Sequence, residues 1–135
     1  MKEKTFRASL DSVGPATAFV ESALEEAGCA MKAMMQINVA MDELLANIAR
    51  YAYPDGEGDV TVRFEVEEET RTAKITLKDR GVPFNPLEVE EPDVTAAGEK
   101  RPIGGLGIFL VRKTMDDLSY EYRDGYNLLT VRKKI

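Results

Sequence analysis

The spacing of apolar residues changes sharply between residues 52 and 60 of this chain, and the change limits the folds it can adopt. Over residues 31–52 apolar side chains recur about every 3.6 residues, which is typical of one face of a helix. That stripe comprises Met34, Ile37, Met41, Leu44, Ile48 and Tyr51. From Val60 onward apolar and polar residues alternate, which is typical of strands buried on one face. The sequence therefore predicts a sheet with a covered face and a helix whose stripe faces it.

Two strands are expected after this helix, which Pro54 and the turn sequence "PDGEG" bring to an end. The alternating sets are Val60, Val62, Phe64 and Val66 in the first strand, and Ala73, Ile75 and Leu77 in the second. Asp79 continues the second set at the same period, so its carboxylate should face inward. Because an unpaired buried polar group costs about 1–3 kcal/mol, we expect Asp79 to have a partner.

Shorter elements flank these three. Residues 5–10 are expected to form a first strand, with Phe6, Ala8 and Leu10 alternating, and residues 11–27 a helix. The apolar face of that helix is expected to include Ala16, Phe19, Val20, Ala23 and Leu24, and Gly28 is placed to end it. A long polar stretch, residues 80–102, precedes a third expected helix over residues 106–116. Loops of this length are usually lids or disordered segments.

A hairpin is expected near the end of the sequence. Asp124 and Gly125 suit a two-residue type I′ turn, which would pair Arg123 with Tyr126. This register places Leu118, Tyr120, Tyr122, Leu129 and Val131 on one face. The order of elements predicts an α+β two-layer sandwich, with helices on one face of a mixed, mainly antiparallel sheet. We expect one domain over residues 1–135, with a lid at about 80–103.

Composition excludes several chemistries. The chain has no histidine, which excludes a Ser-His triad, a His-ligated zinc and an imidazole base. Its single cysteine, Cys29, excludes an intramolecular disulfide and a cysteine-based metal cluster. The net charge of −6 argues against direct nucleic-acid binding, which depends on Lys and Arg. No segment approaches the roughly 20 apolar residues that span a bilayer, so we expect a cytoplasmic protein with no membrane partner.

Three groups of residues are candidates for a functional site. Glu43 and Asn47 lie four apart on the long helix, so they share one face, although such a pair alone is typical of a solvated helix surface. Asp79 and Gly81 suit either a turn or a carboxylate that accepts a hydrogen bond from a ligand amino group.

The third group is glycine-rich. Gly104, Gly105 and Gly107 are expected just before or at the start of the third helix, where unpaired N–H groups suit a phosphate. The spacing fits neither the Walker nor the Rossmann motif. Taken alone, these glycines suit a hinge with close helix–sheet packing as well as they suit phosphate binding.

The ordered combination of these motifs is more specific than any one of them. In "DELLANIARYAYP" (42–54), "DRGVPFNP" (79–86) and "GGLGIFLVRKTMDDLSYEY" (104–122) the sequence resembles the Bergerat-fold ATPase superfamily, which includes gyrase, sensor histidine kinases and mismatch-repair ATPases. It is more similar to the anti-sigma-factor serine/threonine kinases of bacterial partner-switching systems. The sensor kinases carry a second glycine where this chain has Pro83, which favours the anti-sigma branch.

The resemblance implies ATP and Mg²⁺ as cofactors and a role for each candidate. Glu43 would be the general base, and Asn47 would coordinate Mg²⁺. Asp79 would accept from the adenine amino group, with Gly81 shaping the base pocket. The phosphates would lie against Gly104, Gly105, Leu106 and Gly107, with Lys100 or Arg101 of the lid supplying a positive charge.

The resemblance also implies partners. The expected function is phosphorylation of a serine or threonine on an antagonist protein, by a regulator that also sequesters a sigma factor and forms a homodimer. Two alternatives stay open at this point: a nucleotide-gated protein-binding module with little or no phosphotransfer, and a detached histidine-kinase ATP-binding domain. Retention of Glu43 argues against the first, because binding alone needs no base.

Overall fold

The computed structural model describes residues 1–88 and 103–135, except for the side chains of residues 103–106. Its five strands are β1 (Lys2–Arg7), β2 (Asp59–Glu67), β3 (Thr72–Asp79), β4 (Asp117–Arg123) and β5 (Tyr126–Lys134). Its helices are α1 (Val13–Glu26), α2 (Met31–Tyr51) and α3 (Ile103–Thr114), with short 3₁₀ turns at η1 (Leu10–Ser12) and η2 (Pro86–Glu88). The element order is the one that the sequence predicts.

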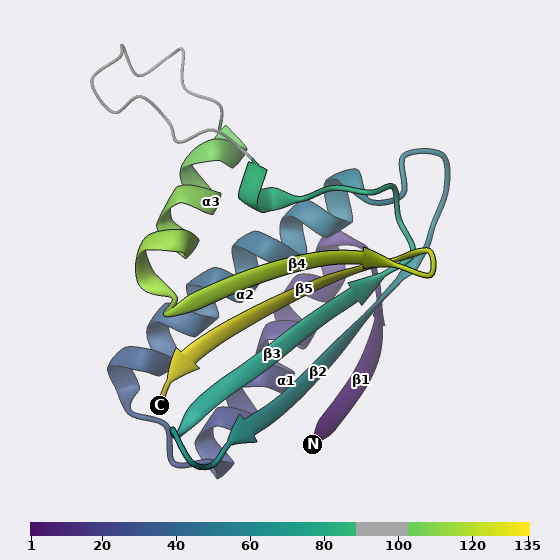
Figure 1. Ribbon diagram of the computed structural model, residues 1–135. Helices are drawn as coiled ribbons and strands as arrows, with labels where there is room; N and C mark the ends of the chain where they lie inside the picture. Colours follow the sequence, from purple (N-terminus) through teal and green to yellow (C-terminus); the bar gives the residue numbers. More distant parts are fainter. Residues whose placement is uncertain (89–102) are drawn as a thin grey trace, which may run out of the picture.

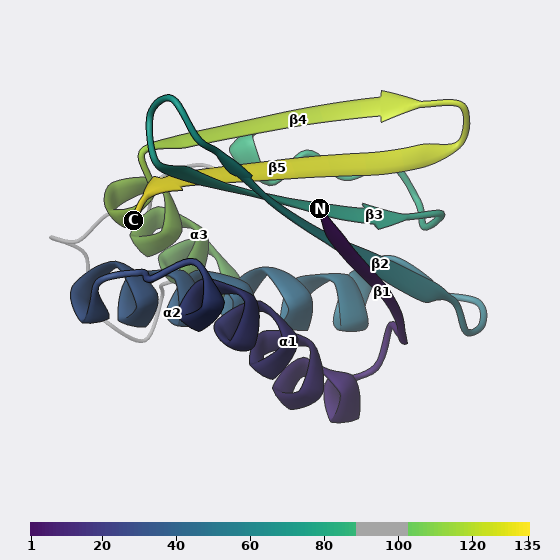
Figure 2. The ribbon, with the colours of Figure 1, turned by 90° about the horizontal axis from the view of Figure 1, so that it is seen from below.

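The strands form one sheet in the order β1-β2-β3-β5-β4, and every pairing between these strands is antiparallel. Figure 1 shows α1 and α2 behind this sheet and α3 beside it, and Figure 2 shows the two layers edge-on, with all three helices on the same face. The α+β two-layer sandwich is therefore confirmed. The sheet is antiparallel throughout the described strands. This holds both for neighbours joined by a hairpin and for neighbours joined by a longer connection.

The core lies between the two layers. The inward-facing residues of β2 and β3 are the predicted ones, with Val60, Val62, Phe64, Ala73, Ile75 and Leu77 buried. Along α2 the predicted stripe is buried from Met34 to Leu44, but Tyr51 is 54% exposed. The prediction for Tyr51 is wrong because the last turn of α2 borders an open cleft, which this side chain lines, rather than the covered part of the sheet.

The first strand is shifted from its predicted position. It pairs with β2 from Lys2 opposite Phe64 to Arg7 opposite Asp59, so it ends three residues before the predicted end at Leu10. Leu10 begins η1 and is 56% exposed. Three alternating apolar residues do not reveal where a partner strand ends, which is why the local pattern misplaced this strand.

Two turn predictions are confirmed. Gly28 follows the end of α1 with φ = 76°, a left-handed conformation that ends many helices at glycine. Asp124 and Gly125 have φ of 55° and 82°, as a type I′ turn requires, and Arg123 pairs with Tyr126. The hairpin register that follows from this turn decides which residues of β5 face the helices.

Candidate functional site

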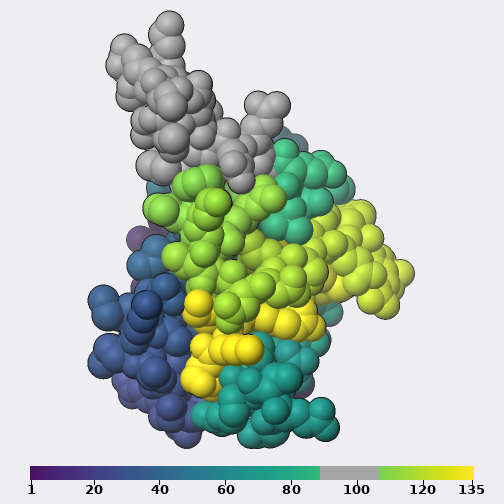
Figure 3. All heavy atoms as spheres, turned by 60° about the vertical axis from the view of Figure 1, so that its left-hand side comes forward, coloured from purple at the N-terminus to yellow at the C-terminus, as the bar shows by residue number. Residues whose placement is uncertain are grey.

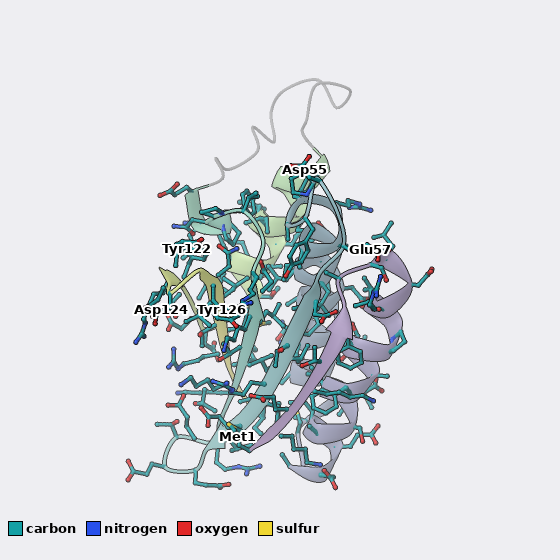
Figure 4. All side chains as sticks on the ribbon, turned by 90° about the vertical axis from the view of Figure 1, so that its right-hand side faces the viewer. Met1, Asp55, Glu57, Tyr122, Asp124 and Tyr126 are labelled. Atoms are coloured by element: carbon teal, nitrogen blue, oxygen red, sulfur yellow. The ribbon has the colours of Figure 1, made fainter. Side chains whose placement is uncertain are left out.

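A cleft opens between the C-terminal half of α2 and the adjoining ends of β3, β4 and β5. Its volume is about 430 Å³, including the space open to solvent. Its lining is largely apolar and comprises Leu44, Asn47, Ile48, Tyr51, Ala52, Asp79, Val82, Phe84, Pro86, Tyr120, Asn127 and Leu129. Figure 4 views the end of the molecule where the loop after α2, bearing Asp55 and Glu57, and the β4–β5 hairpin, bearing Asp124, come forward. Two candidates from different motifs, Asn47 and Asp79, thus meet at one cleft.

Asp79 is the last residue of β3 and is only 5% exposed. Its Oδ1 accepts a hydrogen bond from the Gly81 N–H at 2.8 Å and another from the side-chain amide of Asn127 at 2.9 Å. The expected hydrogen-bond partner of the buried carboxylate is therefore Asn127, which is not among the residues predicted from the sequence. Asn127 lies directly opposite Asp79 in the β3–β5 pairing.

A signal for Asn127 is present in the sequence. The turn that pairs Arg123 with Tyr126 also pairs Tyr122 with Asn127, which places Asn127 in the same inward-facing row as Leu129 and Val131. A polar residue in an otherwise apolar row needs a polar partner. Extending the hairpin register by one residue therefore identifies Asn127 as a candidate.

The pKa of Asp79 is raised above its ordinary value, chiefly because burial disfavours the charged carboxylate. The hydrogen bonds from Asn127 and from the Gly81 N–H act in the opposite direction, since both stabilise the charge. The two tyrosines near Asp79, Tyr53 and Tyr120, also have raised pKa values, mainly through burial. Both tyrosines are therefore neutral at physiological pH, whereas the carboxylate of Asp79 changes charge in acid.

Gly81 brings the start of the lid segment onto the end of α2. A side-chain carbon at this position would overlap the carbonyl oxygen and the Cβ of Ala52. The next residue, Val82, donates its N–H to that same carbonyl at 2.8 Å. Glycine is required here for close packing, and the packing places Val82 and Phe84 on the wall of the cleft.

Glu43 and Asn47 project from α2 as the four-residue spacing predicts. Asn47 is 8% exposed and lines the cleft, whereas Glu43 is half-buried and contacts α3. A Cβ on Gly107 would overlap the carboxyl group of Glu43, so this glycine lets the two helices approach at the Glu43 side chain. The resemblance places Gly107 against phosphates, and the structure adds a second, intramolecular reason for glycine at this position.

The glycine segment begins α3 rather than preceding it. The helix starts at Ile103 instead of the predicted position 106, so Gly104 and Gly105 lie in its first turn with Leu106 and Gly107 following. The first four N–H groups of a helix have no partner within it, so they remain available to an acceptor. The lid candidates Lys100 and Arg101 lie outside the described residues. Figure 3 shows α3, in green, beside the early part of α2, in blue, on one face of the molecule.

Among residues 1–88 and 103–135 no three acidic, cysteine or histidine side chains gather closely enough to hold a metal ion by themselves. No helix in the part of the chain that the structure describes is long and apolar enough to cross a membrane.

Comparison with known proteins decides the family. The family model described as "Histidine kinase-like ATPase domain" matches residues 6–133, nearly the whole chain. The chain belongs to this family. The match includes both the α2 motif and the glycine segment of α3, so the family assignment and the cleft geometry concern the same residues.

Relatives in this family carry kinase names. The serine-protein kinase RsbW of Bacillus mycoides is 29% identical over 109 residues, which cover 78% of this chain and 67% of that protein. RsbW of Listeria monocytogenes is 28% identical over 111 residues, covering 78% of this chain and 69% of the relative. The serine/threonine-protein kinase BtrW of Bordetella bronchiseptica is 28% identical over 95 residues, covering 70% of this chain and 66% of that protein.

A solved structure supports the fold. The histidine kinase domain of a blue-light activated histidine kinase from Erythrobacter litoralis aligns with a TM-score of 0.57 at 18% identity. The alignment covers 90% of this chain and 60% of that one. The histidine kinase-like ATPase fold that the motifs predict is thereby confirmed.

Proposed function

We propose that this chain is a Mg·ATP-dependent serine/threonine protein kinase that phosphorylates an antagonist protein within a partner switch. Relatives named serine-protein kinases support the reaction class. The observation that carries the proposal is the buried carboxylate of Asp79 at an apolar cleft that also contains Asn47. A buried acceptor among apolar walls suits a flat base with an exocyclic amino group, as adenine has.

The residues of the cleft fit the adenine end of ATP. Two N–H donors hold Oδ1 of Asp79, so the orientation of the carboxylate is set before a ligand arrives. The role we assign to Asp79 is to accept from the adenine amino group through its remaining lone pairs. Gly81 supports that role indirectly, because its packing against Ala52 builds the wall on which the base would lie.

Asn47 fits a magnesium ligand. Mg²⁺ usually binds one or two protein oxygens together with substrate phosphates and waters, so a single amide oxygen beside the phosphates is a suitable contribution. When bound, the ion neutralises charge on the phosphates during transfer. The first turn of α3, with Gly104, Gly105 and Leu106, supplies the backbone N–H groups that we assign to the phosphates. We retain Lys100 or Arg101 as the additional positive charge.

Glu43 is the general base of the proposal. It lies one helical turn from Asn47, and its carboxylate contacts the α3 backbone at Gly107. This position lets it accept the proton of an attacking hydroxyl while the phosphates lie against α3. With no histidine in the chain, a carboxylate is the natural base for this step.

The wider regulatory role is part of the same proposal. We propose an antagonist protein as the phosphoacceptor, a sigma factor as the protein that this chain sequesters, and a homodimer as the active form. The names of the relatives support the kinase step. The sigma factor and the dimer rest on the resemblance of the motifs to the anti-sigma-factor kinases.

The test is label transfer from γ-labelled ATP. We would incubate the protein with Mg²⁺, the labelled ATP and a protein extract of the source cells, and identify labelled residues by mass spectrometry. Label on serine or threonine that is stable in acid, and absent with Glu43→Gln, would support the kinase. Label on histidine, which is lost in acid, would support the histidine-kinase alternative instead. Binding of ATP without any transfer would favour the nucleotide-gated binding module.

A further inference from the structure

Asn127 is the most extensively hydrogen-bonded side chain at the cleft, and no motif includes it. It lies near the start of β5, opposite Asp79, and is 5% exposed. Its amide nitrogen is 2.9 Å from Oδ1 of Asp79, 3.0 Å from the carbonyl oxygen of Val82 and 3.3 Å from that of Gly81. Three acceptors from β3 and the lid segment thus share one side-chain amino group.

The amide oxygen of Asn127 is equally engaged. It accepts the backbone N–H of Phe84 at 3.2 Å and the hydroxyl of Tyr120. These donors come from the lid segment and from β4, so the Asn127 side chain joins three parts of the chain. The contacts also fix which end of the amide points where, because N–H and O–H donors surround the oxygen and acceptors surround the nitrogen.

We propose that Asn127 is the positioning residue of the adenine site: it orients Asp79 and ties the first residues of the lid, 81–84, to the same side chain. The inference rests on the proposed nucleotide function and deepens it. Asn127 acts through Asp79 and the backbone, since its own donors and acceptor are occupied by protein groups. Adenine recognition and the course of the lid segment are thereby coupled at one residue.

The chemistry of the amide matters for this role. Only a side chain that both donates and accepts satisfies Asp79 on one side and the Phe84 N–H on the other. The donated hydrogen bond also lowers the pKa of Asp79, against the larger effect of burial, because it stabilises the charged carboxylate. An isosteric carboxylate at position 127 would accept from Phe84 but would oppose Asp79 at neutral pH.

The decisive experiment is the pH profile of ATP affinity in Asn127→Asp. Asn127 and Asp79 lie within hydrogen-bond distance, so two carboxylates at these positions share one proton in acid. The protonated carboxyl at position 127 then donates to Asp79 as the amide did. The tyrosines that face Asp79, Tyr53 from the α2 end and Tyr120 from β4, stay neutral over the range tested. We expect calorimetry at pH 8 to show affinity lowered roughly tenfold or more, with much of the loss recovered at pH 5.5.

The matched control is Asn85→Asp. Asn85 lies in the same segment, and the one side-chain hydrogen bond that it makes within the described residues is from the Leu87 N–H, a contact that a carboxylate keeps. This variant adds the same charge directly after Phe84, away from the contact between Asn127 and Asp79, so its ATP affinity should follow the wild-type pH profile. An Asn127→Asp profile that matches the Asn85→Asp profile at every pH would overturn the proposal.

A second variant tests the lid contact without nucleotide. In Asn127→Ala the Phe84 N–H loses its acceptor, and we expect its hydrogen exchange to become roughly tenfold faster or more. The β3 amides that pair with β2 serve as internal references. Unchanged exchange at Phe84 in a folded variant would contradict the proposed role.

These outcomes separate the two proposals. If the wild-type protein binds no ATP, the proposed function fails, and the exchange measurement still tests how Asn127 holds the lid segment. If the wild type binds ATP and the ATP affinity of Asn127→Asp equals that of the wild type at both pH 8 and pH 5.5, the proposed function stands and the positioning role fails.

Discussion

The carboxyl group of Glu43 packs against the bare Cα of Gly107, where α2 and α3 meet. A methyl group at position 107 would overlap Cγ, Cδ and Oε1 of Glu43, so the whole end of that side chain would have to move. The glycine therefore does more than free the backbone at the start of a helix. It permits the position of the residue that we propose as the base.

Gly107→Ala is expected to impair transfer more than binding. Displacement of a catalytic group by about 1 Å commonly costs on the order of 100-fold in rate, so we expect a loss between about tenfold and 100-fold in label transfer. ATP affinity measured by calorimetry should change by less, because Asp79 and the backbone N–H groups of residues 104–106 that we assign to the phosphates are untouched.

Gly14→Ala is the matched control for this change. Gly14 lies near the start of α1, as Gly107 does near the start of α3, but a Cβ there meets nothing within 4 Å. Transfer by this variant should equal that of the wild type. Equal losses in both variants would contradict the assigned role of the Gly107 contact.

Asp79→Asn should weaken ATP binding and stabilise the ligand-free protein at neutral pH. Loss of a charge-assisted hydrogen bond predicts roughly tenfold weaker binding or more. Burial raises the pKa of Asp79 in the folded state, so folding disfavours its charged form and the cost is present above that raised pKa. The variant removes this cost, which we expect to be about 1–3 kcal/mol at pH 7.

The stability gained in Asp79→Asn depends on pH. As the pH falls through the raised pKa of Asp79 toward the ordinary value, the carboxyl becomes protonated in both states and its cost disappears. The stability difference between variant and wild type should therefore shrink toward pH 4, as measured by chemical denaturation. A difference that grows in acid would show that the carboxylate is stabilised by its surroundings instead.

Gly81→Ala is expected to destabilise the protein by about 1–3 kcal/mol, the usual cost of forcing an extra carbon into a packed site. The added methyl would overlap the backbone of Ala52, which has little room to yield at the end of α2. Denaturation midpoints measure the loss. Gly56→Ala is the control, because a Cβ on Gly56 meets nothing within 4 Å. A destabilisation of the same size in both variants would contradict the assigned overlap between the added methyl and Ala52.

Asn47→Ala should weaken ATP binding chiefly when Mg²⁺ is present, because we assign its amide oxygen to the ion. Calorimetric titrations with Mg²⁺ and with a chelator measure this difference. Asn38→Ala is a suitable control, since Asn38 lies on the same helix but donates to Glu21 of α1. If Asn47→Ala weakens binding equally without Mg²⁺, damaged packing is the better explanation.

The periodic parts of this fold follow from local sequence. Val62 and Ile75 face the core because alternation in a strand decides which side chains share a face. Asp124 and Gly125 form the predicted turn because few dipeptides accept two left-handed residues in succession. The limits of β1 and the exposure of Tyr51 were not predicted, since both depend on where a distant segment stops covering them.

The candidate site divides in the same way. The motifs identify Glu43, Asn47 and Asp79, and the sequence alone predicts that an inward-facing carboxylate needs a partner. Asn127 belongs to none of these motifs: it is 48 residues from Asp79 and becomes its neighbour only when β5 pairs with β3. The spacing of apolar residues is set by residues close together in the sequence, so the sequence determines which face of each helix or strand is buried. The pairing of strands and the packing of α3 on α2 depend on the whole chain, and they decide which polar groups meet inside it.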